Sequence, residues 1–363
     1  MARCGLTRRQ LRTIGISDTR MENDGKIRIT ADDLERVSVP RSADSKVDGA
    51  KSFGSVEMAP ALEESKGNFF LKGWVYLGCA GLLTSLIAWA ICEPWFVDGG
   101  RATWANHLLF PLMLTLLCVG FGVAEGIVER TSRKALVRGL MSLGLGLLLG
   151  FVFNFIANIV FTIGLSILAQ TSEITAHSPG LWIARGIAWM GFGVAGGVVY
   201  GIVGQSGKKC AYGIAGGVLG AGIGGVIFDP ISLLAGNGAV SRAVGMALFG
   251  ISTGVAIGLV ESALKDRWLY VSAGPLAGKQ FILYKPVTTI GSDQSCDIYL
   301  FKDPAVLPQH AVIEMRGPRA TLRAAGPVSV QGRLQREGAL LSGDTVQIGR
   351  YAFLYRDRER ASR

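Results

Sequence analysis

The feature that most constrains this chain is an apolar, glycine-rich block that extends from Gly73 to Leu264. Its apolar runs are separated by short basic or polar loops, and several reach the roughly 20 residues that a helix needs to cross about 30 Å of hydrocarbon. Soluble domains seldom have a mean hydropathy above zero, whereas this chain of 363 residues averages +0.37. The sequence therefore predicts a protein that works in a lipid bilayer.

Six runs in the block are long enough to span a membrane. The third is longer than a bilayer requires, so we expect it to tilt or to extend along the interface. The six expected helices cover about 73–92, 107–128, 137–160, 181–204, 210–228 and 242–263.

The charged loops predict how these helices are oriented. Basic residues gather at 130–138, at 208–209 and after the last helix at 265–267, whereas the alternate loops are mainly acidic. The positive-inside rule then places the basic loops and both termini in the cytoplasm. Arg185 and Arg242 depart from this pattern, because they lie at the outer starts of the fourth and sixth helices.

Three of the expected helices end in similar segments: GVAEGIVER, GVVYGIVGQ and GVAIGLVES. We interpret the block as three helical hairpins derived from one ancestral unit. G-x-x-x-G pairs let helix backbones approach closely, as association in lipid requires. The segment AGGVLGAGIGG at 215–225 predicts a fifth helix at the centre of the bundle. The aligned pairs are Gly122 and Gly126, Gly197 and Gly201, and Gly254 and Gly258.

A few polar residues interrupt the apolar runs, namely Asn154 and Asn158 on one face of the third helix, Glu125 and Arg185. They could form a permeation site, or they could hold helices together. We favour the structural role because the sequence forces no charge to the mid-plane. The six cysteines and three histidines form no metal-binding pattern, so no metal or other cofactor is expected.

The composition divides the chain into three parts. Residues 1–72 are charged and poor in aromatics, which predicts a disordered cytosolic tail, with an N-capped helical turn near Thr30. Residues 73–264 form the transmembrane domain. Residues 265–363 form a cytosolic module with a short basic tail, in which short β-type runs from Trp268 onward alternate with turn signals. This pattern predicts an all-β sandwich.

Two runs in this module carry a family resemblance. TIGSDQSCDIYLFKDPAVLPQHAVI resembles the core of the forkhead-associated (FHA) family, and VQGRLQREGALLSGDTVQIGRYAFLY resembles its C-terminal part. The resemblance covers about 268–356 and implies a β-sandwich that binds phosphothreonine peptides through loops at one end. The implied frame residues are Gly291, His310, Gly332, Gly343 and Asp344.

The residues that should contact the peptide depart from the family pattern. The arginine after the first glycine is replaced by Ser292, the phosphate-binding serine by Leu307, and the S-x-N-G turn is reduced to AAGPVS before Val330. Weak or no phosphothreonine recognition is therefore expected, since a phosphate needs charge-assisted donors. The implied peptide-binding loops contain Ser292, Asp293, Leu307, Gln309, Gln331 and Arg333.

The sequence as a whole predicts a membrane-anchored adaptor in the bacterial inner membrane, without enzymatic activity. We see no catalytic motif and no paired carboxylates within the membrane block. The net charge of +10 is explained by membrane-orienting loops, not by nucleic acid. The expected partners are the lipid bilayer and a cytosolic protein, with phosphoproteins and a homo-oligomer left open. The alternative is a small channel or carrier regulated through the FHA-like module.

Overall fold

The computed structural model describes residues 68–98, 101–171, 173–235 and 237–358. The expected tail lies outside the described residues up to residue 67, and so does the helical turn predicted near Thr30. The described chain begins with a short 3-10 helix, η1 (Phe69–Leu71), in which the Asn68 side chain accepts a hydrogen bond from the Phe70 N–H.

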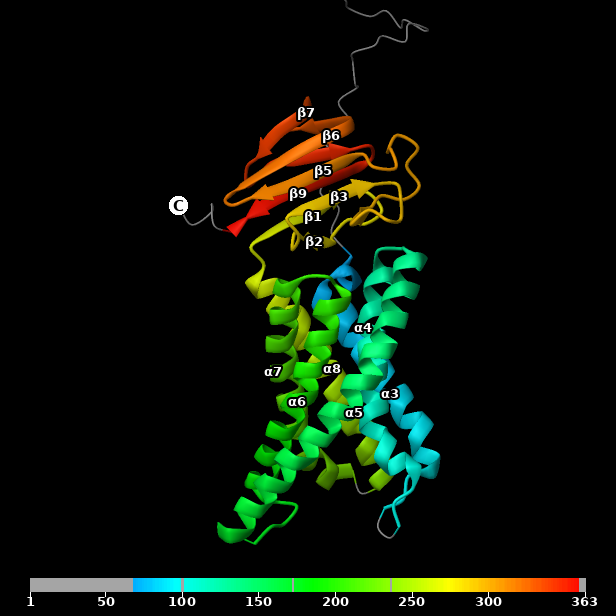
Figure 1. The fold of residues 1–363 in the computed structure, drawn as a ribbon, viewed down its shortest axis with the longest axis vertical. Coiled ribbons are helices and arrows are strands. Elements are labelled where there is room, and N and C mark those ends of the chain that lie inside the picture. Colours follow the sequence, from blue (N-terminus) through cyan, green and yellow to red (C-terminus); the bar gives the residue numbers. More distant parts are fainter. Residues whose placement is uncertain (1–67, 99–100, 172, 236, 359–363) are drawn as a thin grey trace, which may run out of the picture. The chain divides into compact units, whose positions relative to one another are not determined.

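Six long helices follow in the described part of the chain (Figure 1), as predicted. All six are long and apolar enough to cross a membrane by length and composition. The short 3-10 helix η2 (Glu93–Trp95) follows the first of them. The long helices are α3 (Gly73–Cys92), α4 (Trp104–Val128), α5 (Ser132–Thr171), α6 (Pro179–Val203), α7 (Gly207–Ala235) and α8 (Gly238–Leu264).

The six helices form a closed bundle. Each packs against the next along the chain, and α8 also packs against α3, which closes the ring. The excess length of the third span is accommodated in one continuous helix, because α5 has 40 residues. Fewer residues of α5 than of any other span are buried.

The aligned glycines occupy equivalent contacts. A Cβ on Gly122 or Gly126 would collide with α5, one on Gly197 or Gly201 with α7, and one on Gly254 or Gly258 with α3. The glycines therefore join each expected hairpin to the next, and the last hairpin to the first.

The expectation that the fifth helix is central is wrong. The glycines of α7 do contact both neighbours, since Gly217 faces Gly193 of α6 and Gly220 faces Thr253 of α8. However, Leu219 and Ile223 on its outer side are exposed. Glycines on two sides of a helix allow close contact with two neighbouring helices, but a central position would also need helices on its remaining side. The helices with the most buried residues are α4 and α6.

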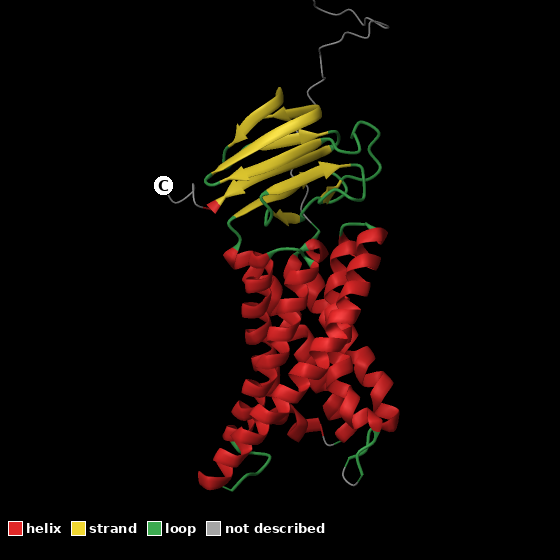
Figure 2. Cartoon of the chain, in the orientation of Figure 1, coloured by secondary structure: helices red, strands yellow, loops and turns green. Residues whose placement is uncertain are grey.

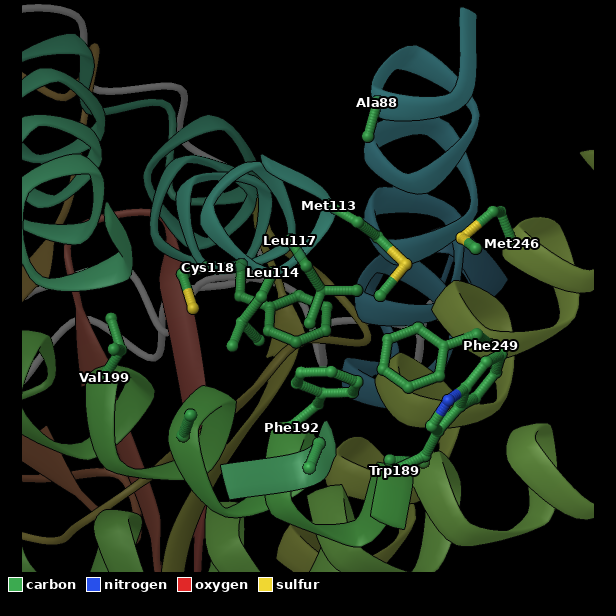
Figure 3. Packing of buried hydrophobic residues seen from close by; sticks show 14 of the residues in the cluster. Ala88, Met113, Leu114, Leu117, Cys118, Trp189, Phe192, Val199, Met246 and Phe249 are labelled. Atoms are coloured by element: carbon green, nitrogen blue, oxygen red, sulfur yellow. The ribbon is translucent and has the colours of Figure 1, made fainter. Parts of the chain in front are cut away.

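Large side chains fill the centre of the bundle (Figure 3). Phe192 and Phe249 pack edge to face, with Trp189 against Phe249 and Met113 in the same cluster. Because lipid tails are as apolar as these side chains, close packing and not water exclusion must hold the helices together.

Charged residues lie in two layers at the ends of the bundle. Lys209 and Asp229 are 20 residues apart on α7, and Arg242 and Glu261 are 19 apart on α8. At about 1.5 Å per residue, both separations are about 30 Å, which matches the hydrocarbon thickness of a bilayer. The stretches of α7 and α8 between these residues contain no charged side chain.

The two arginines that departed from the loop pattern lie in the outer layer and are paired. Arg185 Nε lies 2.8 Å from Asp229 Oδ2. Arg242 makes two contacts with Glu93, at 2.6 and 2.9 Å. The aligned segments place the two pairs at equivalent positions of the expected repeat. Each carboxylate precedes a proline at the end of its span, and each arginine is near the start of the adjacent helix.

The C-terminal part folds into a nine-stranded sheet around its own hydrophobic core (Figure 2). The strand order is β2-β1-β9-β8-β6-β5-β3-β4, with β7 paired to β6; only the β3–β4 pair is parallel. The strands are β1 (Arg267–Ala273), β2 (Gln280–Ile282), β3 (Val287–Gly291), β4 (Ile298–Tyr299), β5 (Ala311–Arg316), β6 (Arg319–Val330), β7 (Arg333–Leu340), β8 (Thr345–Ile348) and β9 (Tyr351–Asp357).

Strand β7 was not predicted, because its residues alternate poorly between apolar and polar. A two-residue turn connects β6 to β7 and so brings β7 into antiparallel pairing with β6. Gln331 and Gly332 both have positive φ, at 51° and 77°, which is the geometry of a type I′ hairpin. The AAGPVS segment lies inside the long strand β6, where the β6–β7 register shifts.

Candidate functional site

The loops after β3 and before β5 meet at one end of the sheet. The Ser292 N–H donates to the Leu307 carbonyl at 2.9 Å, and the Ser292 hydroxyl donates to the Val306 carbonyl at 2.9 Å. A Cβ on Gly291 would collide with the Pro308 carbonyl, so glycine permits this close approach. Both donors of Ser292 are therefore used in holding the two loops together.

His310 fixes the second loop from beneath. It is fully buried, its Nδ1 accepts a hydrogen bond from the Leu307 N–H at 3.1 Å, and its Nε2 lies 3.1 Å from the Pro327 carbonyl. Gly326 leaves room for the imidazole, because a Cβ there would collide with the ring. His310 thus links the loop before β5 to β6, and its role in a peptide site stays a prediction.

The side chains that these loops expose include an apolar group, an amide and a carboxylate. Leu307 and Gln309 are exposed. Asp293 places a carboxylate at the same end, where it accepts a hydrogen bond from the Ser295 N–H at 2.9 Å. Hydrogen bonding to Ser295 lowers the pKa of Asp293, so this carboxyl group is an anion at neutral pH.

The other predicted loop residues lie at a different corner. Gln331 donates to the Asp344 carboxylate at 3.2 Å, and Asp344 in turn accepts from the Leu341 N–H at 2.7 Å. Gly343 has a φ of 101° in the same turn. Ala325, beside His310, is six residues from Gln331 along β6, which is about 20 Å in an extended strand. The structure therefore does not bring Gln331 and Arg333 together with Ser292 and Leu307.

The loop after β3 rests on the turn between α4 and α5. Lys134 Nζ donates to the Asp297 carbonyl at 2.9 Å, and the Arg130 guanidinium lies 5.5 Å from the centre of the Phe301 ring. Residues 129–134, which connect α4 to α5, include basic side chains from which the cytoplasmic side of the bundle was predicted. The expected peptide-binding end is thus in contact with the helical bundle.

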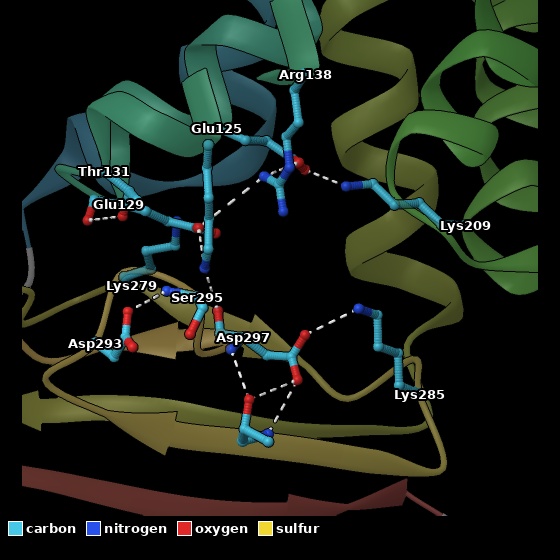
Figure 4. Close-up of polar contacts among 12 residues, drawn as sticks. Glu125, Glu129, Thr131, Arg138, Lys209, Lys279, Lys285, Asp293, Ser295 and Asp297 are labelled. Atoms are coloured by element: carbon cyan, nitrogen blue, oxygen red, sulfur yellow. Dashed lines mark hydrogen bonds and ion pairs between the residues drawn. The ribbon is translucent and has the colours of Figure 1, made fainter. Parts of the chain in front are cut away.

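Asp297 organises this loop (Figure 4). Its carboxylate accepts hydrogen bonds from the Thr289 N–H and hydroxyl, each at 3.0 Å, and from Lys285 at 2.9 Å. Burial alone would raise the pKa of Asp297, but the Thr289 hydrogen bonds and the nearby ammonium outweigh burial and lower it.

This network makes a pH-dependent prediction. A carboxyl whose pKa is lower in the folded protein stabilises it above the ordinary pKa of about 3.9, and this contribution disappears as pH falls through the folded value. We expect Asp297→Asn to lower the free energy of unfolding by about 1.5 kcal/mol at pH 7. The difference from wild type should shrink below about pH 4, as chemical unfolding of the detergent-solubilised chain would measure. A difference independent of pH would contradict this role.

A second group of polar residues lies at the inner end of the bundle. Glu125 of α4 pairs with Lys209 of α7 and with Arg138 of α5, whose Nη1 is 3.0 Å away. The Tyr200 hydroxyl lies 2.8 Å from Glu125 and 3.1 Å from Glu261. Four of the six helices, α4, α5, α6 and α7, therefore meet at the Glu125 carboxylate.

Two side chains from the sheet domain reach this polar cluster. The Tyr284 hydroxyl donates to Glu261 at 2.6 Å, and Lys279 Nζ lies 3.5 Å from Glu129. Burial raises the pKa of Tyr284 and lowers that of Lys279, with Glu129 partly offsetting the effect on Lys279. These residues surround a cavity of about 130 Å³, large enough for several waters. Figure 4 shows Lys279 directed toward the bundle.

Glu125 was recognisable from the sequence as a polar residue in an apolar run, but neither its partners nor the two residues from the sheet were. Lys209 had been assigned only to the orienting loop, and Lys279 follows a turn glycine like any surface lysine. No local signal marks Tyr200 or Tyr284. Among the described residues, no group of His, Cys, Asp and Glu side chains could hold a metal ion.

The C-terminal part of the chain is similar to known proteins. Residues 270–359 match the family described as the cytoplasmic domain of the inner membrane component of T3SS. The C-terminal domain is FHA-like. Solved structures of similar fold include the FHA domain of CT664 from Chlamydia trachomatis, which is 29% identical. The shared part covers 26% of this chain and 98% of that one, with a TM-score of 0.24.

Two characterised relatives match the same region. An oxoglutarate dehydrogenase inhibitor from Corynebacterium diphtheriae is 36% identical over 98 residues, 26% of this chain and 66% of the relative. The glycogen accumulation regulator GarA from Mycolicibacterium smegmatis is 31% identical over 90 residues, 24% of this chain and 56% of the relative. The chain thus spans just under two thirds of one relative and little more than half of the other.

Proposed function

We propose that this protein is an adaptor of the bacterial inner membrane, whose six helices anchor an FHA-like module on the cytoplasmic side. The match of residues 270–359 to a family of cytoplasmic domains from inner membrane components carries this proposal. The two charged layers about 30 Å apart support bilayer insertion. The module follows directly on the basic end of α8, which supports a cytoplasmic location.

The module's role would be to bind a cytosolic protein with little or no dependence on phosphothreonine. Ser292 uses both its donors within the protein, and Leu307 is 44% exposed where the family resemblance implies a hydroxyl. A phosphate carries almost two negative charges and needs charge-assisted donors, whereas Asp293 would repel it. The related inhibitor and regulator support a protein-binding role without enzymatic activity.

A channel or carrier is the alternative, but no specific observation favours it. Phe192, Phe249, Trp189 and Met113 fill the bundle between the two charged layers. A transport pathway usually has broken helices or polar groups near the mid-plane. Each described span is a continuous helix, including α4 and α7, which contain Pro111 and Pro230.

Calorimetry with the detergent-solubilised chain tests the phosphate dependence. We expect no phosphothreonine peptide to bind more tightly than about 100 μM, or about −5.5 kcal/mol. Restoring the family residues with Ser292→Arg and Leu307→Ser supplies charge-assisted donors and should tighten phosphopeptide binding by about tenfold.

The unphosphorylated peptide is the control for both titrations. Low-micromolar, phosphate-dependent binding by the wild-type chain would contradict weak recognition. Capture of a cytosolic protein by the wild-type chain, unchanged after phosphatase treatment, would support the adaptor. Loss of capture after that treatment would show that the module reads phosphate after all.

A further inference from the structure

One helix face in the bundle carries amides with too few partners. On α5, Asn158 is exposed, and its side-chain N–H donates to the Asn154 carbonyl at 2.8 Å. The Asn154 side-chain oxygen is 3.4 Å from Asn158, and its amide nitrogen contacts no acceptor among the described residues. Unsatisfied amides are costly in hydrocarbon, where water cannot compensate them.

Both asparagines lie within the expected membrane. The Arg185 guanidinium, part of the outer charged layer, lies 5.0 Å from the centre of the Phe161 ring on α5. Asn158 is about one helical turn inside that level and Asn154 about two turns, or about 5 and 10 Å. Neither is close enough to reach the aqueous interface with its short side chain.

The repeat explains why one of these positions lacks a partner. Asn154 aligns with Asp229, and its partner position, Phe110, aligns with Arg185. Asp229 and Arg185 form an ion pair between α7 and α6. The corresponding helices α5 and α4 have no such pair, because a phenylalanine occupies the position of the arginine. Asn154 is therefore a polar residue whose counterpart within the chain has been lost.

The two asparagines belong to a seam on α5. Leu147, Phe151, Asn154 and Asn158 follow one another at spacings of four, three and four residues, which places them on one side of the helix. Leu147 is 44% exposed and Phe151 51% exposed, in a helix that has fewer buried residues than the other spans. This spacing is that of the contact positions of paired helices, at which an asparagine fixes register.

We propose that two copies of this chain pair in the membrane through the α5 seam, with their asparagines hydrogen-bonded across the interface. A carboxamide is both a donor and an acceptor, so the same residue on a second copy satisfies it. Lipid tails offer no such group. The proposal rests on the membrane insertion proposed above.

Disulfide cross-linking in membranes tests the seam. Oxidation should join Asn158→Cys chains into dimers with about tenfold higher yield than Ile163→Cys chains. Ile163 is 54% exposed on the same helix, about 7.5 Å further toward the outer end, but it points about 140° away from Asn158. The parent chain, with its native cysteines, sets the background. Equal yields at both positions would overturn the proposal.

A second variant tests whether the amides hold the dimer. Asn154→Leu with Asn158→Leu keeps the helix apolar and should weaken self-association in detergent by about tenfold, or about 1.4 kcal/mol. Ile156→Leu is the control on the other side of α5. An unchanged association constant would also overturn the proposal. Retention of each variant in membranes after an alkaline wash separates failure of the seam from failure of membrane insertion.

Discussion

Replacing Glu125 by glutamine should destabilise the whole bundle. Glutamine has nearly the same size, so packing is retained, but Lys209 and Arg138 lose their shared counter-ion in a buried site. Breaking a buried ion pair on one side typically costs about 3–5 kcal/mol, because the remaining charge is left uncompensated. Unfolding of the purified chain in mixed detergent micelles, followed by circular dichroism, would measure the loss.

Two further variants identify the cause of this loss. Asp98→Asn removes a carboxylate that is 64% exposed and pairs with Arg242. Because Arg242 still pairs with Glu93, this variant should lower the free energy of unfolding by about 0.5 kcal/mol or less. Adding Lys209→Gln to Glu125→Gln removes one stranded cation and should recover part of the lost stability. If Glu125→Gln behaved like Asp98→Asn, the buried cluster would not be a stabilising centre.

The cluster also offers a physical link between the module and its anchor. Tyr284 and Lys279 belong to the sheet domain, yet they contact Glu261 and Glu129 at the inner ends of α8 and α4. Lys279 precedes β2 and Tyr284 follows it, so the turns on both sides of this strand contact groups that hold the helices together.

Local patterns were sufficient to predict the helices and most strands. Hydropathy runs found all six spans, since a bilayer demands about 20 apolar residues wherever a helix crosses it. Strand β7 was missed because its residues lack alternation and depend on the turn at Gln331 and Gly332. Turn geometry, unlike periodicity, is set by two residues and is easily overlooked.

Pairings between distant residues were beyond the sequence analysis. The sequence marked Arg185 as a departure from the loop pattern, and the closed ring of helices identifies Asp229 as its partner. Glu125 and Lys209 are 84 positions apart in the sequence, and Lys279 belongs to a different domain, the C-terminal sheet. Their contacts arise because helix packing brings the inner ends of the helices together, so no spacing in the sequence predicts them. The predicted peptide-binding roles of Ser292, Asp293, Leu307, Gln309, Gln331 and Arg333 stay predictions.

The glycine contacts lead to a prediction about the repeat. Gly197→Ala should destabilise the bundle by about 3 kcal/mol, since its Cβ would collide with the backbone of α7 at Gly213 and Ile214. A backbone cannot rotate away as a side chain can, so the two helices must separate. Unfolding in mixed micelles would measure the effect. Gly254 likewise meets backbone, at the Leu77 carbonyl, so alanine there should destabilise the bundle too; at Gly122 the nearest atom is the Ser142 hydroxyl, which can rotate away, so alanine should cost less.

Gly144→Ala is the matched control for this series. Gly144 also lies within a helix, α5, but a Cβ there meets no atom within 4 Å. Alanine has a higher helix propensity than glycine by about 1 kcal/mol, so this variant should be neutral or slightly more stable. If Gly197→Ala and Gly144→Ala had the same effect, helix propensity alone would account for both results. A clear difference in sign would instead show that close backbone approach is what the aligned glycines provide.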